Sequence, residues 1–356
     1  MNAAIIDEFT RIGGGQVLAK LVFNKLSNDG MDVSFITDSN HRYLDLNSNI
    51  IETRYDYIEN AKLFYIANRV IKTKHDLKKI FKVHKFNLTF NNHPNMFLYN
   101  AKINVLHGFS FLDPFIDEYG NIKNTMAFKL IKYSKIYKIY NNSIFYVNSR
   151  YTLDIANKLF PELNIKPALM KVIYIPVKIN LNSNNLKNKN IVSIGRINKE
   201  KNYDLIIEIA KSLMDYKFYI IGAVNKGDEQ YYNYLMNKKP RNLEIIPNAK
   251  EDLKDIVLKK CSIYLHANRK EHYGISLIEA MSYGLIPVVP KSGGPWIDII
   301  DKGRYGYGYD NIDEAIETIR SIDFSRRDEI KDSLNRFSYK KFSEDLDDLI
   351  NIAYRN

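Results

Sequence analysis

The sequence predicts an α/β protein with two domains, each built on a parallel β-sheet with helices on both faces. The chain has 356 residues, more than one hydrophobic core usually holds. Short apolar runs alternate with segments of helical spacing, and a polar, Asn-rich segment at 180–190 separates two such series. We therefore expect domains at 1–178 and 191–338, a linker at 179–190, and a terminal helix at 339–356 that crosses back toward the first domain.

The composition is that of an ordinary globular protein, with 45% hydrophobic and 26% charged residues. The single cysteine, Cys261, excludes a disulfide framework and a Cys-based metal site. No apolar run approaches the ~18–20 residues of a membrane span, and the N-terminus lacks the features of a signal peptide, so we expect a cytoplasmic protein. The net charge of +11 favours phosphate-bearing partners without choosing among nucleic acid, an anionic membrane and a nucleotide.

The first series of elements opens with an apolar strand, Ala3–Asp7, followed by three glycines, Gly13 to Gly15. Apolar residues at helical spacing then predict a helix over Val17–Leu26, and Val33–Ile36 reads as the next strand. Later in this domain we expect strands at 103–106, 144–147 and 172–175, and basic, aromatic helical segments at 75–86 and 126–140.

The second series repeats the same alternation after the linker. We expect strands at 191–194, 218–221, 243–246, 262–265 and 286–289, and helices at 203–213, 251–260, 276–283, 312–321 and 339–354. Two Rossmann-like domains facing each other across a cleft would place ligands at the carboxyl ends of their strands.

A glycine-containing segment follows the first strand of each domain. Gly14 and Gly15 would let a phosphate or sugar approach the start of a helix, although a flexible connecting loop is the alternative. In the second domain, Gly195 and Arg196 are followed by Lys201. A planar guanidinium and a compact ammonium aimed at one anionic group suit a diphosphate; a solvated basic loop is the alternative.

The segment from Arg269 to Met281 is the most informative. Gly274 at the strand-to-helix turn frees backbone N–H groups for a phosphate. Glu279 lies in a helix that is apolar nearly all round, where a carboxylate needs a partner; sugar or ribose hydroxyls would serve. The alternatives are a surface charge or helix-entry acid for Glu271 and an ion pair for Glu279. The turn at 293–294 either approaches a ligand or simply joins a strand to a helix.

These motifs together resemble the retaining glycosyltransferases of GT-B fold, glycosyltransferase family 4. Arg196 and Lys201 match the Gly-Arg-Leu-x-x-x-Lys element, with Ile197 replacing Leu and Asn202 replacing the usual Gly. Glu271 and Glu279 match the family's two glutamates separated by seven residues. The family's next strand and turn are matched by Gly284, Pro287, Gly293 and Gly294, and its last helices by 311–316 and 337–339. The resemblance spans nearly the whole chain and is specific mainly over 191–300.

The resemblance implies a nucleotide-sugar donor, held mainly by the second domain, and a metal-independent transfer of a hexose with retention. Arg196 and Lys201 would neutralise the diphosphate, Glu279 would accept ribose hydroxyls, and Glu271 would contact the transferred sugar. Leu106-His107-Gly108 resembles the family's His-bearing strand end beside the donor sugar, although a structural histidine is the alternative. The expected catalytic residues are Glu271, Lys201, Arg196 and His107. The expected nucleotide-sugar-binding residues are Gly14, Gly15, Gly195, Arg196, Lys201, Tyr273, Gly274, Ile275, Ser276, Leu277 and Glu279.

The same resemblance implies no cofactor beyond the donor, and we interpret Asp345 and Asp347 as a solvated helix face rather than a manganese site. Residues 271–275 and 292–298 are similar to the mannosyltransferases that build dolichol-linked oligosaccharide, which favours GDP-mannose over a UDP-sugar.

The acceptor stays open among lipid-linked, glycan and protein hydroxyls. Segment 126–140 interleaves lysines with aromatic and aliphatic residues, so it could rest on an anionic membrane; the alternative is a helix with its apolar stripe buried and its lysines outside.

Two other functions have to be weighed. A nucleotide-sugar epimerase of the same fold would need different cleft acids and no acceptor. A basic, non-enzymatic nucleic-acid-binding protein would leave the two glutamates and the glycine turns without a role. We therefore expect no nucleic-acid partner.

Overall fold

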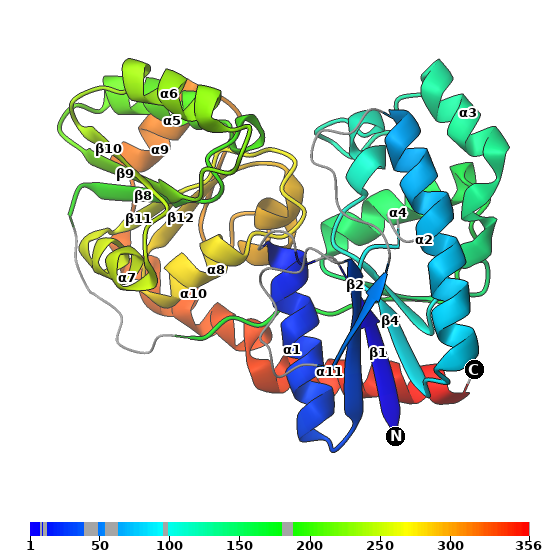
Figure 1. Cartoon of the computed structure of the whole chain (residues 1–356). Helices are drawn as coiled ribbons and strands as arrows, with labels where there is room; N and C mark the ends of the chain where they lie inside the picture. The colour runs from blue at the N-terminus through cyan, green and yellow to red at the C-terminus, as the bar shows by residue number, and fades with distance from the viewer. Residues whose placement is uncertain are drawn as a thin grey trace. The chain divides into compact units, whose positions relative to one another are not determined.

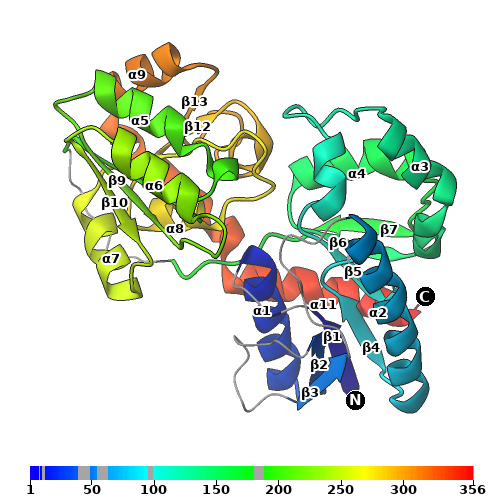
Figure 2. The same cartoon turned by 45° about the horizontal axis from the view of Figure 1, so that its top comes forward.

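The computed structural model describes residues 1–7, 9, 13–38, 49–53, 63–94, 99–179 and 188–355. Contacts divide these residues into two compact units: 1–175 together with 343–355, and 176–342. Most of the predicted linker, residues 180–187, lies outside the described residues. Both units are built on a parallel sheet, as the sequence predicts (Figures 1 and 2).

Within the described part of the first unit, the sheet has seven strands in the order β3-β2-β1-β4-β5-β6-β7. The chain leaves β1 toward β2 and later returns to its other side as β4, so the strand order reverses between β1 and β4. The strands are β1 (Asn2–Ile6), β2 (Asp32–Asp38), β3 (Asn49–Thr53), β4 (Leu88–Asn91), β5 (Ile103–Leu106), β6 (Ile144–Val147) and β7 (Leu169–Val172).

The helices of the first unit follow from this order of strands. Right-handed crossovers in opposite directions place α1 on one face of the sheet and α2 and α4 on the other (Figure 1). Both faces are therefore covered, and β4, β5 and β6 are buried throughout. The helices are α1 (Gly14–Asn28), α2 (Leu63–Val83), α3 (Met126–Ser134) and α4 (Arg150–Glu162), with 3₁₀ turns η1 (Ser110–Phe115) and η2 (Ile136–Tyr140).

In the second unit, the described strands form a six-stranded parallel sheet in the order β10-β9-β8-β11-β12-β13, which reverses between β8 and β11. In Figure 1, α5, α6 and α9 lie on one face of this sheet and α7 and α8 on the other. The strands are β8 (Asn190–Ile194), β9 (Lys217–Gly222), β10 (Leu243–Pro247), β11 (Ile263–Leu265), β12 (Ile286–Pro290) and β13 (Tyr307–Tyr309). The helices are α5 (Tyr203–Ser212), α6 (Glu229–Lys238), α7 (Glu251–Lys260), α8 (Ile275–Ser282), α9 (Ile312–Arg320) and α10 (Arg327–Asp332), with short turns η3 (Lys199–Lys201), η4 (Pro295–Ile299), η5 (Phe324–Arg326) and η6 (Ser333–Phe337).

The last helix, α11 (Tyr339–Arg355), contributes to both units, because contacts assign its residues from Ser343 onward to the first unit. Leu346 and Leu349 are fully buried there, and Asp347 forms an ion pair with Lys25 of α1 at 2.7 Å. Among the described helices, none combines the length and the apolar character that crossing a bilayer requires.

Two predicted elements need correction. The last strand of the first sheet is Leu169–Val172 rather than 172–175, because its partner β6 ends at Val147, which pairs with Val172. Ile173 and Ile175 remain buried, which explains why that apolar run resembles a strand. The helical segment predicted at 126–140 is broken at Lys135, whose φ of 54° separates α3 from η2. The sequence pattern also missed β3, β4, β13, α4, α6 and α10.

Candidate functional site

The strongest candidate site lies at the carboxyl edge of the second sheet, between β8 and β11. Lys201 ends η3, which follows β8, and Glu271 follows β11. Lys201 Nζ forms a salt bridge to Glu271 Oε2, with side chains only 19% and 20% exposed. The order of strands reverses at this edge, which is where ligands bind in open α/β sheets. The fold thus brings together two of the residues that the sequence predicts to be catalytic.

A buried histidine adjoins this pair. His266 follows β11 directly, and its Nε2 lies 3.9 Å from Glu271 Oε2. Burial alone would raise the pKa of Glu271, but the charge of Lys201, with His266, outweighs it and lowers that pKa to about 2. Burial lowers the pKa of His266 to about 4 despite the neighbouring Glu271. At neutral pH the cluster therefore holds a charged Lys201–Glu271 pair beside a neutral imidazole.

Hydrogen bonds fix the backbone after β8. Tyr203 Oη donates to the carbonyl of Gly195 at 2.8 Å, and Ser276 Oγ donates to the carbonyl of Ile194 at 2.9 Å. Gly222, at the end of β9, packs so closely that a Cβ there would lie 1.8 Å from the carbonyl oxygen of Gly195. The segment containing Gly195 is therefore a rigid support for the side chains that follow it.

Helix α8 begins at this edge in the way that the sequence predicts. Gly274 is its N-cap with φ +111°, a conformation that favours glycine, and Leu277 N–H donates to the Gly274 carbonyl at 3.0 Å. The turn at 293–294 supports the segment before α8, because Gly294 N–H donates to the Glu271 carbonyl at 2.8 Å. A Cβ on Gly294 would lie 2.3 Å from the His272 carbonyl oxygen, so close backbone packing alone explains that glycine.

Glu279 and Arg196 each pair with another residue rather than with Lys201 or Glu271. Glu279, on α8, pairs with Lys254 of α7 at 2.7 Å, so the ion pair considered as the alternative is present. Lys254 also pairs with Glu251 at 2.6 Å. Arg196 faces Glu200 at 3.8 Å and is about a third exposed, so in this structure it does not share a partner with Lys201.

Of the remaining predicted residues, Tyr273 is buried and Ile275 begins α8. Gly14 begins α1. His107 and Gly15 belong to a polar cluster in the first unit that the sequence does not predict. Its centre is Asp7, directly after β1 and fully buried. His93 Nε2 lies 2.9 Å from Asp7 Oδ1, Asn92 Nδ2 donates to Asp7 Oδ2 at 2.7 Å, and His107 Nε2 lies 2.8 Å from Asn92 Oδ1. A signal was available for Asp7, an acid ending an apolar strand, but none for Asn92 or His93 without β4.

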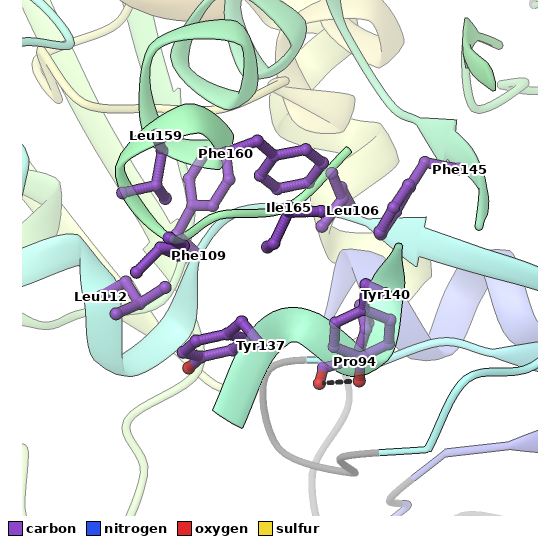
Figure 3. Close-up of a pocket in the computed structure, with 11 residues that line it drawn as sticks. Pro94, Leu106, Phe109, Leu112, Tyr137, Tyr140, Phe145, Leu159, Phe160 and Ile165 are labelled. Atoms are coloured by element: carbon purple, nitrogen blue, oxygen red, sulfur yellow. Dashed lines mark hydrogen bonds between the residues drawn. The ribbon is translucent and has the colours of Figure 1, made fainter. Parts of the chain in front are cut away.

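An apolar pocket lies beside the strand end that holds His107 (Figure 3). Its lining includes Leu106 and Phe109, which flank the His107-Gly108 pair, and Tyr140 Oη donates to the Pro94 carbonyl at 2.5 Å. Its wall is apolar apart from two tyrosine hydroxyls, so it supports the His107 segment by packing. The lining residues are Pro94, Leu106, Phe109, Leu112, Tyr137, Tyr140, Phe145, Leu159, Phe160, Leu163 and Ile165.

Within the part of the chain that the structure covers, no three His, Cys, Asp or Glu side chains lie close enough together to hold a metal ion. Asp345 and Asp347 lie on α11, as predicted. The Asp345 carbonyl accepts from Lys171 at 3.1 Å, and the half-exposed Asp347 carboxylate pairs with Lys25.

Comparison with known proteins finds a family match in the second unit. Residues 177–341 match the family described as glycosyl transferases group 1. The chain is 31% identical over 131 residues to GDP-Man:Man(3)GlcNAc(2)-PP-Dol alpha-1,2-mannosyltransferase of Yarrowia lipolytica, covering 32% of this chain and 21% of that one. It is 28% identical to the Dictyostelium discoideum enzyme of the same name, over 47% and 38%. A glycogen synthase of Acholeplasma laidlawii is 27% identical, over 36% and 29%. The chain thus spans between 21% and 38% of the length of these relatives.

Solved structures match over almost the whole chain. The sucrose-phosphate synthase of Thermosynechococcus elongatus superposes with a TM-score of 0.78 and 13% identity, covering 99% of each chain. The Anabaena protein HepE, solved with UDP and glucose, gives 0.71 and 15% identity over 98% and 99%. At such identities the likeness concerns the fold, and it confirms the predicted GT-B class.

Proposed function

From the match of residues 177–341 to the glycosyl transferases group 1, we propose that the chain transfers a hexose from a nucleotide-diphosphate sugar to an acceptor hydroxyl, with retention at the anomeric carbon. The Lys201–Glu271 pair, buried beside neutral His266 at the switch point of the second sheet, is the observation that best supports this proposal. Burying two charged side chains costs desolvation free energy, so we expect a buried ion pair at a strand end to bind a ligand or to stabilise the fold.

In the proposed reaction the second unit holds the donor. Lys201 and Arg196 neutralise the diphosphate, helped by the N–H groups at the start of α8, Gly274 to Leu277, of which the Leu277 N–H is shared with the Gly274 carbonyl. Glu279 accepts hydrogen bonds from the ribose hydroxyls through the carboxylate that also pairs with Lys254. Glu271 contacts the transferred sugar. We propose the same donor sugar and phosphates as ligands of His107, Gly14 and Gly15 of the first unit.

The leaving diphosphate gains negative charge as the bond to the anomeric carbon breaks. Cations placed there stabilise the transition state more than the ground state, and this is the largest contribution expected from the protein. The acceptor hydroxyl attacks the anomeric carbon from the same face through an oxocarbenium-like state, and its proton passes to the departing diphosphate. Since Arg196 and Lys201 supply the positive charge, we propose that transfer needs no metal, and EDTA should leave the rate unchanged.

For the donor we propose GDP-mannose, with a UDP-sugar as the alternative. The relatives named above include enzymes whose names specify GDP-mannose, whereas HepE was solved with UDP and glucose. A thermal-shift series with GDP, UDP, ADP, GDP-mannose, UDP-glucose and UDP-N-acetylglucosamine, without metal, tests the proposal. Selective stabilisation by the guanine nucleotides supports it, because a ligand that binds only the folded state raises the unfolding temperature. Stabilisation by uridine nucleotides alone contradicts the GDP-mannose proposal, and no shift at all contradicts the donor site.

We further propose that the segment 126–140 rests on an anionic membrane, which suits a lipid-linked acceptor. Met126, Leu130 and Tyr133 are 73%, 66% and 74% exposed, and they recur along one side of α3. Exposed Lys129, Lys135 and Lys138 accompany them. Phe128, Tyr137 and Tyr140 are buried instead, so the segment both anchors itself and presents an apolar, basic surface.

A further inference from the structure

We propose that Lys254 is a positioning residue for nucleotide recognition, which holds the Glu279 carboxylate so that its second oxygen accepts hydrogen bonds from the ribose hydroxyls of the donor. This inference rests on the proposed function and deepens it, because it assigns the residue that prepares Glu279 for the ribose. Lys254 belongs to none of the motifs that the sequence singles out.

Lys254 and Glu279 meet at the edge of the second sheet where the donor is proposed to bind. Lys254 lies in the first turn of α7, which follows β10, and Glu279 lies on α8, which follows β11. Both helices begin at the carboxyl ends of parallel strands and cover the same face of the sheet (Figure 1). A ligand at this edge therefore meets the beginnings of both helices.

Ion pairs hold the Lys254 ammonium between two carboxylates. Its Nζ lies 2.7 Å from Glu279 Oε1 and 2.6 Å from Glu251 Oε2, and its side chain is only 15% exposed. Burial by itself would lower the pKa of Lys254, but its hydrogen bonds to Glu251 and Glu279 and their charges outweigh burial and raise that pKa. Lys254 is therefore a charged donor with a fixed position at neutral pH.

This pairing leaves Glu279 with one oxygen for a ligand. Among the residues that the structure describes, Lys254 is the only side chain that pairs or hydrogen-bonds with the Glu279 carboxylate, and it does so at Oε1. The Glu279 side chain is 24% exposed, although its neighbours Ile278 and Ala280 are buried. Oε2 is thus an acceptor whose direction is set by the ion pair at Oε1.

The charge of this group favours hydroxyl ligands over anions. Two carboxylates, Glu251 and Glu279, and one ammonium, Lys254, leave a net negative charge, so a phosphate is repelled. An ionised carboxylate accepts hydrogen bonds and donates none, and the 2′- and 3′-hydroxyls of a ribose are neighbouring donors. A carboxylate that an ammonium already holds in place binds them at a lower entropic cost than one that rotates freely.

A purely structural role would make Lys254 a link between α7 and α8, but these helices are joined elsewhere as well. Tyr283, directly after α8, donates its Oη hydrogen to Asp255 Oδ1 of α7 at 2.7 Å. Val257 and Leu258 of α7 are buried. We therefore expect the fold to survive replacement of Lys254, so that its contribution to nucleotide binding can be measured.

The test compares ribonucleotides with their 2′,3′-dideoxy forms by isothermal titration calorimetry on the full chain. The probes are GDP against 2′,3′-dideoxy-GDP and UDP against 2′,3′-dideoxy-UDP, without metal. In the wild-type chain we expect the ribonucleotide of the preferred base to bind at least about tenfold more tightly, the effect of hydrogen bonds to a charged group. In Lys254→Met this preference should fall to about twofold, while the affinity for the dideoxy form stays within about twofold of wild type.

Matched variants separate positioning from structure and from charge. Lys260→Met removes the same charge from an exposed position on α7 and should keep the wild-type preference. Lys254→Arg should restore part of it, because a cation returns to the same place. Loss of a merely structural link would weaken the binding of both nucleotide forms equally and leave their ratio unchanged. If Lys254→Met does not fold, Lys254→Gln takes its place, because it also removes the charge.

The inference is overturned if Lys254→Met, or Lys254→Gln in its place, keeps the wild-type preference for the ribonucleotide. A wild-type chain that binds both forms equally also overturns it, together with the ribose role of Glu279. Failure of the proposed function looks different, because the wild-type chain then binds neither GDP nor UDP, and the inference falls with it.

Discussion

At the scale of single residues, Lys201 and Glu271 show how burial and charge determine each other. Each side chain is about four-fifths buried, so each would be costly alone, and together they remain ionised. The low pKa of Glu271 follows from its pairing with Lys201, because burial alone would raise that pKa. A donor diphosphate that engages Lys201 would change the charge balance that Glu271 experiences.

Removing one member of this pair should damage both stability and activity. We expect Lys201→Met to lower the free energy of unfolding by about 2–3 kcal/mol, because Glu271 is left without its partner. It should lower kcat roughly 100-fold by removing a cation from the leaving group. Urea unfolding and transfer kinetics measure the two effects.

The double variant Lys201→Met/Glu271→Gln is the matched control. It should recover most of the lost stability, since no unpaired charge remains, while the low kcat persists. Recovery of kcat together with stability would show that Lys201 acts only structurally.

His266 should make stability depend on pH in a defined window. Its pKa is about 4 when folded, against 6.5 as the ordinary value, so the unfolded chain binds a proton that the folded chain does not. The free energy of unfolding should therefore fall as pH drops from 6.5 toward 4, by up to about 3 kcal/mol from this group. The lowered pKa of Glu271 adds a loss of stability in the same direction, mainly below pH 4.5, because the unfolded carboxyl there binds a proton that the folded one does not.

The check is urea unfolding of the wild-type chain and of His266→Gln between pH 4.5 and 7. The wild-type curve should slope more steeply than that of the variant. Parallel curves would mean that His266 is already protonated in the folded chain or is solvated there.

At the scale of elements, position relative to the sheet decides what each segment can do. α8 begins with glycine at the sheet edge, and the turn at 293–294 packs against the backbone just before it. The sequence alone does not show whether those glycines make room for a ligand or for a neighbouring backbone segment, because either use requires a residue without a side chain. The close approach of Gly294 to the His272 carbonyl shows a contact that only the fold reveals.

The exposed surface of α3 leads to a prediction about membranes. We expect the wild-type chain to co-sediment with vesicles of phosphatidylglycerol and phosphatidylcholine, and less so with phosphatidylcholine alone. Replacing Lys129, Lys135 and Lys138 by Gln should weaken binding about 100-fold, since each lysine contributes roughly 1 kcal/mol near an anionic surface.

Replacing Lys78, Lys79 and Lys82, which are exposed on α2, by Gln is the matched control with the same change in charge. Equal losses from both sets would indicate a general charge effect and contradict a specific role of 126–140. No binding by the wild-type chain would contradict it outright.

At the scale of the whole molecule, α11 links the two units through the sequence. Its first residues belong to the second unit, and those from Ser343 onward bury apolar side chains in the first. Deleting 343–356 should lower the stability of the first unit by at least about 5 kcal/mol, because Leu346, Leu349 and Ile350 leave a buried environment.

Two probes separate the units in this experiment. The single tryptophan, Trp296, reports on the second unit by fluorescence, whereas far-ultraviolet circular dichroism reports on both. The truncated chain should lose part of its dichroism at low urea while the Trp296 transition stays in place. Simultaneous loss of both signals would show that α11 stabilises the two units together.

The sequence by itself determined the fold class, most of the strands and the two motifs that contain Lys201, Glu271 and Glu279. It could do so because buried parallel strands are continuous apolar runs, and because glycines and charges at strand ends are local features. It also anticipated the ion pair of Glu279 as one of two alternatives, without naming Lys254.

Tertiary structure alone decided which distant residues meet. Asp7, Asn92, His93 and His107 come from the ends of three strands, and nothing local in the sequence joins them. Strand register decided where β7 ends, and a single left-handed residue, Lys135, divided one predicted helix into two elements. Pairing across a sheet and the strain of one backbone angle depend on the whole fold, so periodicity and composition do not contain them.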